Sequence, residues 1–159
     1  MASQLDADEV APGLWVGRTP PDGTKLTGID AVVLAAVERQ PILVGVRTLR
    51  CPLDDGRPTE QEIKQAWRCA QDVVRLRQRG QKVLVACALG KNRSAWVAAM
   101  VLMQEGMTAR DAVRRIRAER RLPREYGQAL SNPHFVRVLE ALDEQRQAKR
   151  VRPHLQLVR

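Results

Sequence analysis

One loop, Cys87-Ala-Leu-Gly-Lys-Asn-Arg93, carries the residue types that chemistry on a phosphate ester needs. Its cysteine becomes a nucleophile once the thiol loses its proton. The backbone N–H groups of a glycine-containing loop that leads into a helix can bind a phosphate-sized anion. The arginine can bind two phosphate oxygens through its planar guanidinium group. Together these residues predict phosphoryl transfer through the sulfur of Cys87.

The spacing of cysteine and arginine is not informative by itself. Each of the three cysteines has an arginine six residues later, in a chain that contains 22 arginines. Two carboxylates that would repel a phosphate follow Cys51, and Cys69 lies in a helical pattern whose N–H groups are already bonded. Only Cys87 follows an apolar, strand-like run and precedes an apolar helix. We therefore interpret Cys87 as the nucleophile rather than as a small buried residue at a strand end.

The rest of the loop is the expected phosphate-binding site, and the residue after it has two interpretations. Ser94 could donate a hydrogen bond to the sulfur of Cys87 and help it leave, or it could be an ordinary serine in a first helical turn. Lys91 should point toward solvent, where it could contact an acidic substrate. The residues expected to bind the phosphate are Ala88, Leu89, Gly90, Lys91, Asn92 and Arg93.

The chemistry also needs a carboxylic acid that protonates the leaving group and later deprotonates water. Asp54 and Asp55 follow a predicted strand at residues 46–52, so one of them is suitably placed. The alternative is that the Asp-Asp-Gly run forms only a turn. Asn132 precedes Pro133 and fits a helix N-cap, the preferred interpretation, or a support for the Cys87 loop.

The elements that must position these residues alternate along the chain. Apolar runs predict strands at residues 13–17, 30–35, 46–52 and 82–86, with helices after the last two and further helices after Thr108 and Asn132. This alternation predicts a single-domain α/β fold with a mostly parallel central sheet of four to five strands, flanked by helices on both faces. Ligands of such folds bind at the carboxyl ends of the strands, where the Cys87 loop lies.

The expected organisation is a flexible N-terminus at residues 1–10, a catalytic domain at residues 11–144 and a basic tail at residues 145–159. The net charge of +9, with 22 arginines and five lysines, favours anionic partners such as phosphorylated proteins, nucleotides, nucleic acid or acidic lipid. A basic surface also serves solubility, so the charge does not decide between these readings.

The expected localisation and the expected lack of a cofactor rest on motifs that the sequence does not contain. No stretch resembles a signal peptide or is apolar for long enough to span a membrane. Three irregularly spaced cysteines argue against a disulfide framework, so we expect a cytoplasmic protein. The chain has two histidines and no Cys/His cluster with zinc spacing, so neither a metal nor another cofactor is expected.

These motifs resemble the protein tyrosine phosphatase superfamily, in its compact dual-specificity branch, over most of residues 11–142. The segments that carry the resemblance are residues 11–17, 28–33, 52–55, 83–94 and 132–135. The resemblance implies that Cys87 is the nucleophile, Arg93 the phosphate clamp and Asp55 the general acid and base. It also implies that Ser94 assists the departure of the sulfur.

Two positions, one just before the loop and one in it, qualify this resemblance. Ala86 stands where the family usually has a histidine, which predicts a nucleophile that ionises less readily and an enzyme that is slower. Lys91 matches a lysine that is frequent in the family's phosphoinositide phosphatases.

Oxidation is a further hypothesis, because Cys51 or Cys69 could trap an oxidised Cys87 as a disulfide. Both cysteines are more simply interpreted as core residues.

The leading hypothesis is a cysteine-dependent phosphatase acting on phosphotyrosine and also on phosphoserine or phosphothreonine. An alternative on the same fold is a phosphatase for phosphoinositide, nucleotide or RNA 5′-phosphate. A second alternative is a non-catalytic binder of phosphoprotein or nucleic acid. The chain is only 3% aromatic and has no recognisable nucleic-acid motif, which makes nucleic-acid binding the weakest of these hypotheses.

Overall fold

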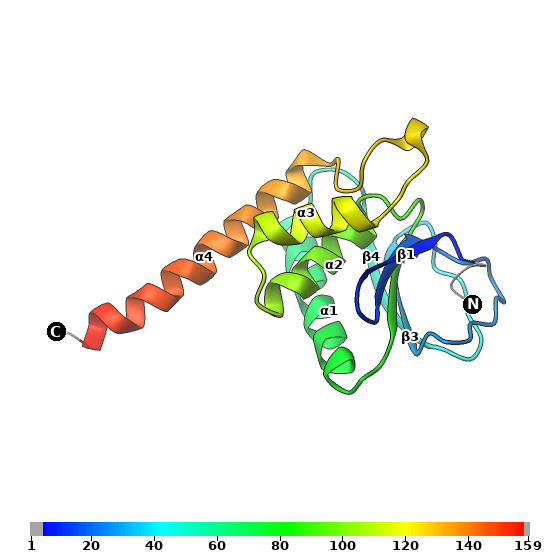
Figure 1. Ribbon diagram of the computed structural model, residues 1–159, viewed down its shortest axis with the longest axis horizontal. Coiled ribbons are helices and arrows are strands. Elements are labelled where there is room, and N and C mark those ends of the chain that lie inside the picture. The colour runs from blue at the N-terminus through cyan, green and yellow to red at the C-terminus, as the bar shows by residue number, and fades with distance from the viewer. Residues whose placement is uncertain (1–4, 158–159) are drawn as a thin grey trace.

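The structure, a computed structural model, describes residues 5–157, with side chains described as far as Arg150 (Figure 1). The described chain forms five strands and four α-helices, with four strands before the first helix. Their order is β1 (Ala7–Ala11), β2 (Leu14–Arg18), β3 (Ala31–Ala36), β4 (Arg47–Leu53), α1 (Glu60–Gln78), β5 (Val83–Cys87), α2 (Arg93–Gln104), α3 (Ala109–Glu119), the short 3-10 helix η2 (Arg124–Tyr126) and α4 (Pro133–Leu157).

The strands form one sheet in the order β1-β2-β5-β3-β4. Only the β1–β2 pair is antiparallel, and the other pairs are parallel. This confirms the predicted single α/β domain with a mostly parallel sheet. Because parallel strands end at the same edge, the carboxyl ends of β2, β3, β4 and β5 lie together, with Cys87 at the end of the central strand.

The central strands are apolar because both of their faces are covered. Every residue of β3 and of β5 is buried. Val33 and Val85 belong to the larger core on the helical side of the sheet, and Val32 and Leu84 belong to a smaller core on the opposite side. Continuous apolar runs, rather than alternating ones, are what such strands require.

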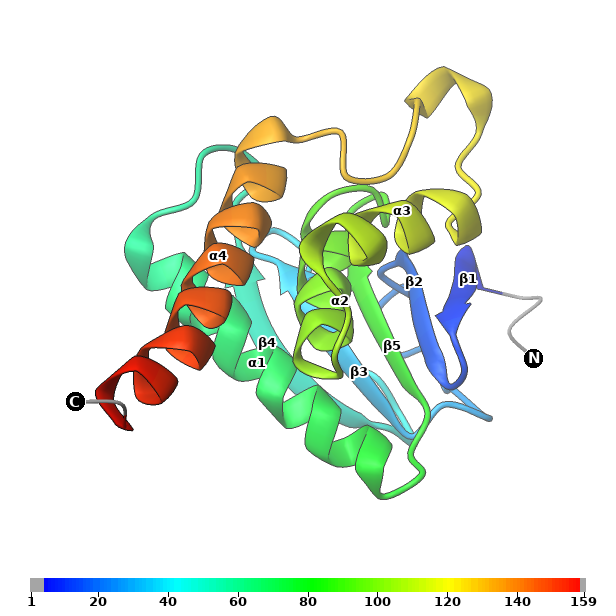
Figure 2. The ribbon, with the colours of Figure 1, turned by 60° about the vertical axis from the view of Figure 1, so that its left-hand side comes forward.

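The sequence predicted helices on both faces of the sheet. Instead, all four α-helices of the described chain lie on one face (Figure 2). The opposite face is covered by the connections at residues 19–30 and 37–46. Proline and glycine in both connections disfavour a helix, so loops cover this face instead. Their side chains that pack into the smaller core are Leu26, Ile29 and Leu43.

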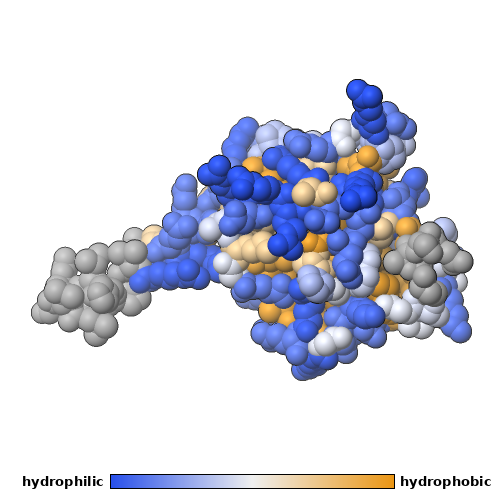
Figure 3. All heavy atoms as spheres, viewed as in Figure 1, coloured by the Kyte–Doolittle hydropathy of each residue, from blue (hydrophilic) through white to orange (hydrophobic). Residues whose placement is uncertain are grey.

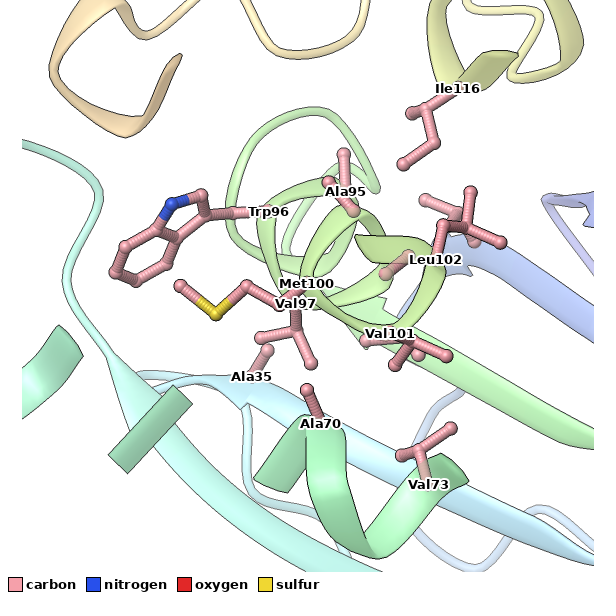
Figure 4. Packing of buried hydrophobic residues seen from close by; sticks show 14 of the residues in the cluster. Ala35, Ala70, Val73, Ala95, Trp96, Val97, Met100, Val101, Leu102 and Ile116 are labelled. Atoms are coloured by element: carbon pink, nitrogen blue, oxygen red, sulfur yellow. The ribbon is translucent and has the colours of Figure 1, made fainter. Parts of the chain in front are cut away.

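Helix α2 forms the centre of the larger core. Every residue from Arg93 to Met103 is buried, because the helix is packed against the sheet and against α1, α3 and α4. Figure 4 shows Val97 pointing toward Ala35 of β3 and Ala70 of α1. A helix that is apolar on every side is expected in this position.

The helix starts follow local capping rules. Thr59 and Glu62 form the complete capping box at the start of α1, as predicted. The Thr108 side chain accepts a hydrogen bond from the N–H of Asp111 and caps α3. Asn132 accepts a hydrogen bond from the N–H of His134, 2.9 Å away, and caps α4.

The N-terminal segment corrects one expectation. Residues 7–10, expected to be flexible, belong to β1, which pairs with β2. The carboxylates of Asp6 and Asp8 are bound to Arg120, at 3.0 and 2.9 Å. The strand therefore forms through tertiary contacts that its short acidic sequence does not indicate. Residues 1–4 of the expected flexible segment lie outside the described part.

The C-terminal segment corrects another. Residues 145–157 of the expected basic tail continue α4, which extends away from the rest of the molecule in Figure 1. The side chains of residues 147–150 are exposed. Most residues between 143 and 150 have high helix propensity, which extends the helix without an amphipathic pattern. Residues 158–159 lie outside the described part.

The face of the molecule in Figure 3 is mostly hydrophilic, with small apolar areas between the charged side chains. Among the described residues, no helix combines the length and the apolar character that crossing a membrane would require.

Candidate active site

The Cys87 loop joins the end of β5 to the first turn of α2. Gly90 in its middle has a φ of +68°, a conformation that favours glycine. A Cβ atom at this position would lie 2.5 Å from the carbonyl carbon and 2.7 Å from the carbonyl oxygen of Gly17. The loop therefore packs directly on the backbone of β2 and needs a glycine for that contact.

The loop leaves several donors without acceptors. Within the described chain, no acceptor is found for the backbone N–H groups of residues 88–93. The Nε atom of Arg93 is buried and is likewise without a partner there. A buried donor such as Arg93 Nε is costly unless something accepts from it. An oxyanion of phosphate size supplies several acceptor oxygens at once.

Cys87 is only 2% exposed, and its Sγ atom lies 3.1 Å from the Oγ atom of Ser94. Its carbonyl oxygen accepts hydrogen bonds from the N–H and the hydroxyl of Thr19, at 2.8 and 3.1 Å. The sulfur is therefore held at the end of the strand, with one hydroxyl directed at it.

Arg93 is held by Glu38, which follows the end of β3. Its two terminal nitrogens form a bidentate pair with the Glu38 carboxylate, and Nη1 also donates to the carbonyl of Leu53 at 2.9 Å. Burial disfavours the charged guanidinium, but the hydrogen bond to Glu38 and the nearby Cys87, Glu38 and Asp55 charges outweigh it and raise the pKa of Arg93. The clamp therefore stays positively charged.

Asp55, rather than Asp54, presents its carboxylate to the loop. One of its oxygens accepts from Nδ2 of Asn92 at 3.2 Å, and the other accepts from Nδ2 of Asn132 at 3.0 Å. The adjacent Asp54 is instead held through its backbone N–H, which donates to Glu62 of α1 at 3.0 Å. Two amide side chains therefore orient the Asp55 carboxylate next to the loop.

Asn132 combines the two interpretations that the sequence left open. It caps α4 through its carbonyl oxygen, and its amide nitrogen donates to Asp55 and to the carbonyl of Gly56. Asn92 makes no side-chain cap for α2, because its side chain bonds Asp55 and the N–H of Asn132 instead. These two asparagines link the Cys87 loop to the loop that carries Asp55.

Arg120 supports the Cys87 loop from outside it. This arginine is 3% exposed and donates to the carbonyl oxygens of Leu89 and Gly90, at 2.9 and 3.0 Å. Its remaining terminal nitrogen binds Asp6 and Asp8. By binding two carbonyls of the loop, it fixes the orientation of the adjoining peptide groups and ties the loop to the N-terminal segment.

The other two cysteines, Cys51 and Cys69, are hydrogen-bonded to each other as free thiols. Both are buried and free, and the hydrogen bond with Cys51, together with burial, raises the pKa of the Cys69 thiol. The described contact of the Cys87 sulfur is to Ser94. The hypothesis that Cys51 or Cys69 traps an oxidised Cys87 therefore gains no support, since Cys51 and Cys69 have each other as partners.

Three supporting residues were not expected from the sequence: Glu38, Arg120 and Asn92 in its role toward Asp55. Glu38 had a usable signal, because it directly follows a buried strand at the edge where ligands bind. Arg120 had none, since nothing distinguishes it among 22 arginines. Its role depends on contacts with residues more than a hundred positions away.

Comparison with known proteins agrees with this arrangement. Residues 15–145 match the family described as "Dual specificity phosphatase, catalytic domain". The match includes the whole Cys87 loop and Asp55, Glu38 and Arg120. The chain belongs to this family and is a cysteine-based phosphatase of the compact dual-specificity branch. Membership implies phosphorylated substrates.

Solved structures share the fold. A mouse putative dual specificity phosphatase complexed with zinc tungstate has a TM-score of 0.76 and 22% identity, covering 92% of this chain and 91% of its own. Human DUSP28 has a TM-score of 0.75 and 24% identity, covering 89% of this chain and 99% of its own. The human tyrosine phosphatase-like serine/threonine/tyrosine-interacting protein has a TM-score of 0.69 and 22% identity, covering 89% and 97%.

Proposed function

We propose that this protein hydrolyses phosphate monoesters through a phosphocysteine intermediate on Cys87. The observation that carries the proposal is the set of unpaired donors, six backbone N–H groups and Arg93 Nε, in the loop that begins at this cysteine. Such donors stabilise the oxygens of a phosphoryl group during its transfer between oxygen and sulfur.

In the first step, the Cys87 thiolate attacks phosphorus and the bond from phosphorus to the ester oxygen breaks. The loop N–H groups and Arg93 bind the three phosphoryl oxygens that do not leave. Asp55, in its protonated form, donates its proton to the departing oxygen. The products of this step are the free alcohol or phenol, a phosphocysteine and the Asp55 carboxylate.

In the second step, the Asp55 carboxylate takes a proton from water while the water oxygen attacks phosphorus. The sulfur–phosphorus bond breaks and inorganic phosphate is released. Ser94, whose hydroxyl lies 3.1 Å from the sulfur, donates a hydrogen bond to the thiolate as it forms. Asp55 and Cys87 are thereby returned to their starting states.

Phosphorylated proteins are the first candidate substrates, in agreement with the family. Small phosphorylated compounds, such as an inositol phosphate or a nucleotide, are a second candidate, favoured by unpaired arginines beside the loop that are described below. A non-catalytic role is disfavoured, because nucleophile, clamp and acid are all present in one loop cluster. A cytoplasmic location is part of the proposal, supported by the three free thiols.

Hydrolysis of p-nitrophenyl phosphate without added metal tests the mechanism. Cys87→Ser should abolish turnover, and Asp55→Asn should lower kcat about a hundredfold or more while vanadate still binds, because it removes the proton donor and leaves the oxyanion site intact. Cys69→Ala, which removes another buried thiol, is the matched control and should keep its activity. Turnover that survives in Cys87→Ser would exclude a phosphocysteine.

A further inference from the structure

A cavity of about 610 Å³ lies beside the Cys87 loop, and Asp55 is not among its lining residues. Its walls come from the N-terminal segment, from the connection that follows β2 and from the connection that follows β3. Ala88 of the loop forms part of its boundary. The lining residues are Leu5, Asp6, Arg18, Thr19, Pro20, Pro21, Asp22, Glu38, Arg39, Gln40, Pro41 and Ala88.

The three carboxylates that line this cavity are already bonded. Asp6 binds Arg120 at 3.0 Å, and Asp22 accepts a hydrogen bond from the N–H of Ile42 at 2.7 Å. Glu38 forms the bidentate pair with Arg93. Each of these negative charges is therefore offset, or its oxygen occupied, by a partner in the chain.

The two arginines that line it are not bonded in this way. Within the described chain, neither Arg18 nor Arg39 has a side-chain hydrogen bond or an ion pair, and both are exposed. Arg18 is the register partner of Cys87 across the β2–β5 pair, so the backbones of the two residues are neighbours. Arg39 follows Glu38, and its charge helps to lower the pKa of that carboxylate. Both cations are thus close to the phosphate site.

We propose that this cavity is a second anion-binding subsite, in which Arg18 and Arg39 bind a further phosphate group of a compact substrate whose scissile phosphate lies at Cys87. The inference rests on the function proposed above and favours the second candidate class of substrate. The shared chemistry is that of a small bisphosphate, which a soluble inositol bisphosphate or a nucleoside bisphosphate provides.

The dimensions and walls of the cavity favour a compact ligand over a peptide. Its volume falls in the range of about 300–1,000 Å³ that small-molecule sites occupy. Pro20, Pro21 and Pro41 have a fixed φ, which stiffens both walls. A preformed cavity with two unpaired guanidinium groups suits a small ligand with concentrated charge, because little has to be ordered when it binds.

Paired substrates test the proposal. We would compare inositol 4-phosphate with inositol 4,5-bisphosphate, AMP with adenosine 3′,5′-bisphosphate, and a singly with a doubly phosphorylated peptide. The wild-type kcat/KM should be about tenfold or more higher for a small bisphosphate than for its monophosphate, since one charge-assisted contact has this effect. The double variant Arg18→Gln/Arg39→Gln should lose this preference and keep its activity on p-nitrophenyl phosphate.

Arg115→Gln is the control. It removes one positive charge from an exposed position on α3 and should leave the preference for the bisphosphate intact. Calorimetry with Cys87→Ser gives a readout independent of turnover: inositol 4,5-bisphosphate should bind about tenfold or more tightly than the monophosphate, through Arg18 and Arg39.

Equal rates within both small-molecule pairs and equal binding in calorimetry would overturn the subsite. A preference that survives Arg18→Gln/Arg39→Gln would do the same. A preference only for the doubly phosphorylated peptide would overturn the compact substrate. In each case, Cys87-dependent hydrolysis of p-nitrophenyl phosphate would leave the proposed function standing. Loss of that hydrolysis with intact bisphosphate binding would overturn the function and keep the subsite.

Discussion

Arg93 is held in its orientation by Glu38, which follows the end of β3. A bidentate arginine–carboxylate pair fixes the plane of the guanidinium group as well as its position. Nη1 and Nη2 are occupied by this pair, whereas Nε is left for another acceptor. Glu38 is thus a positioning residue for the phosphate clamp. Its side chain is 48% exposed, so solvent screens the pair and its net effect on stability is small.

Glu38→Gln should lower kcat/KM about tenfold, because a neutral amide cannot form two charge-assisted bonds to Arg93. The pair of Glu38 and Arg93 also makes the stability of the folded protein depend on pH. The bond from Arg93 lowers the pKa of Glu38 below its ordinary 4.5, so the carboxylate stabilises the folded state fully above that pH. This stabilisation is lost as the pH falls through the lowered pKa.

Thermal melts of the wild type and of Glu38→Gln between about pH 3 and pH 7 would measure this. The difference in Tm should be greatest above pH 5 and should shrink below it. Glu119→Gln, which changes an exposed residue of α3, is the control and should change neither rate nor pH dependence. A Tm difference that grows toward acid would contradict the assigned pairing.

At the scale of elements, the Cys87 loop depends on what lies behind it. Gly90 packs on the backbone of Gly17 in β2, and Arg120 binds the carbonyls of Leu89 and Gly90. These contacts turn the loop carbonyls away from the site, which leaves the N–H groups for an anion. The shape of the loop is therefore set by β2 and by the segment after α3, and not by its own sequence alone.

Replacement of two glycines separates close packing from backbone strain. Gly90 and Gly80 have similar φ values, +68° and +78°, but a Cβ at Gly80 would meet nothing within 4 Å. Gly80→Ala should cost only about 1 kcal/mol of the free energy of unfolding, for the strained φ. Gly90→Ala should cost several times more, at least about 3 kcal/mol, and should abolish activity, because the backbone of Gly17 has to move.

Urea denaturation of both variants and assay with p-nitrophenyl phosphate would check this. Equal destabilisation of the two proteins would show that the contact between Gly90 and Gly17 is not tight. An active Gly90→Ala enzyme would mean that the loop does not need this geometry.

At the scale of the molecule, one-sided packing of the helices joins the site to the C-terminal helix. The rings of Trp96 in α2 and Phe135 in α4 are stacked, with centroids 4.2 Å apart and planes inclined by 7°, and both are fully buried. Asp143 of α4 accepts from the N–H of Ala109 at 2.7 Å, and Arg146 donates to Met103 at 2.7 Å. Helix α4 is thereby held against α2 and α3, with Asn132 at its start.

Phe135→Ala should lower the free energy of unfolding by about 3–5 kcal/mol, because it leaves a cavity in the core and removes the ring stack. Tyr126→Ala, at a side chain that is 41% exposed, should change it by less than about 0.5 kcal/mol. Urea denaturation followed by circular dichroism measures both. A loss below about 1 kcal/mol for Phe135→Ala would mean that α4 contributes little to the core.

Much of the fold was predictable because the signals are local. The apolar runs that became β3 and β5 and the capping box at Thr59 and Glu62 depend on neighbours within a few residues. The coverage of the second face was not predictable in this way. Proline and glycine disfavour helices in these connections, but the contacts through which Leu26 and Leu43 cover the sheet are tertiary and have no local signal. Similarly, β1 exists through its pairing with β2 and through Arg120.

The sequence by itself determined the chemistry of the Cys87 loop, because the nucleophile, the clamp and the loop donors lie within seven consecutive residues. Only the tertiary structure decided that Glu38 orients the clamp, that Asn92 and Asn132 hold Asp55, and that Arg120 supports the loop. These contacts join loops at the ends of strands and helices, between residues that lie 30 to 77 positions apart in the chain. Parallel strands end at one edge of a sheet, and the loops that meet at this edge bring these side chains together.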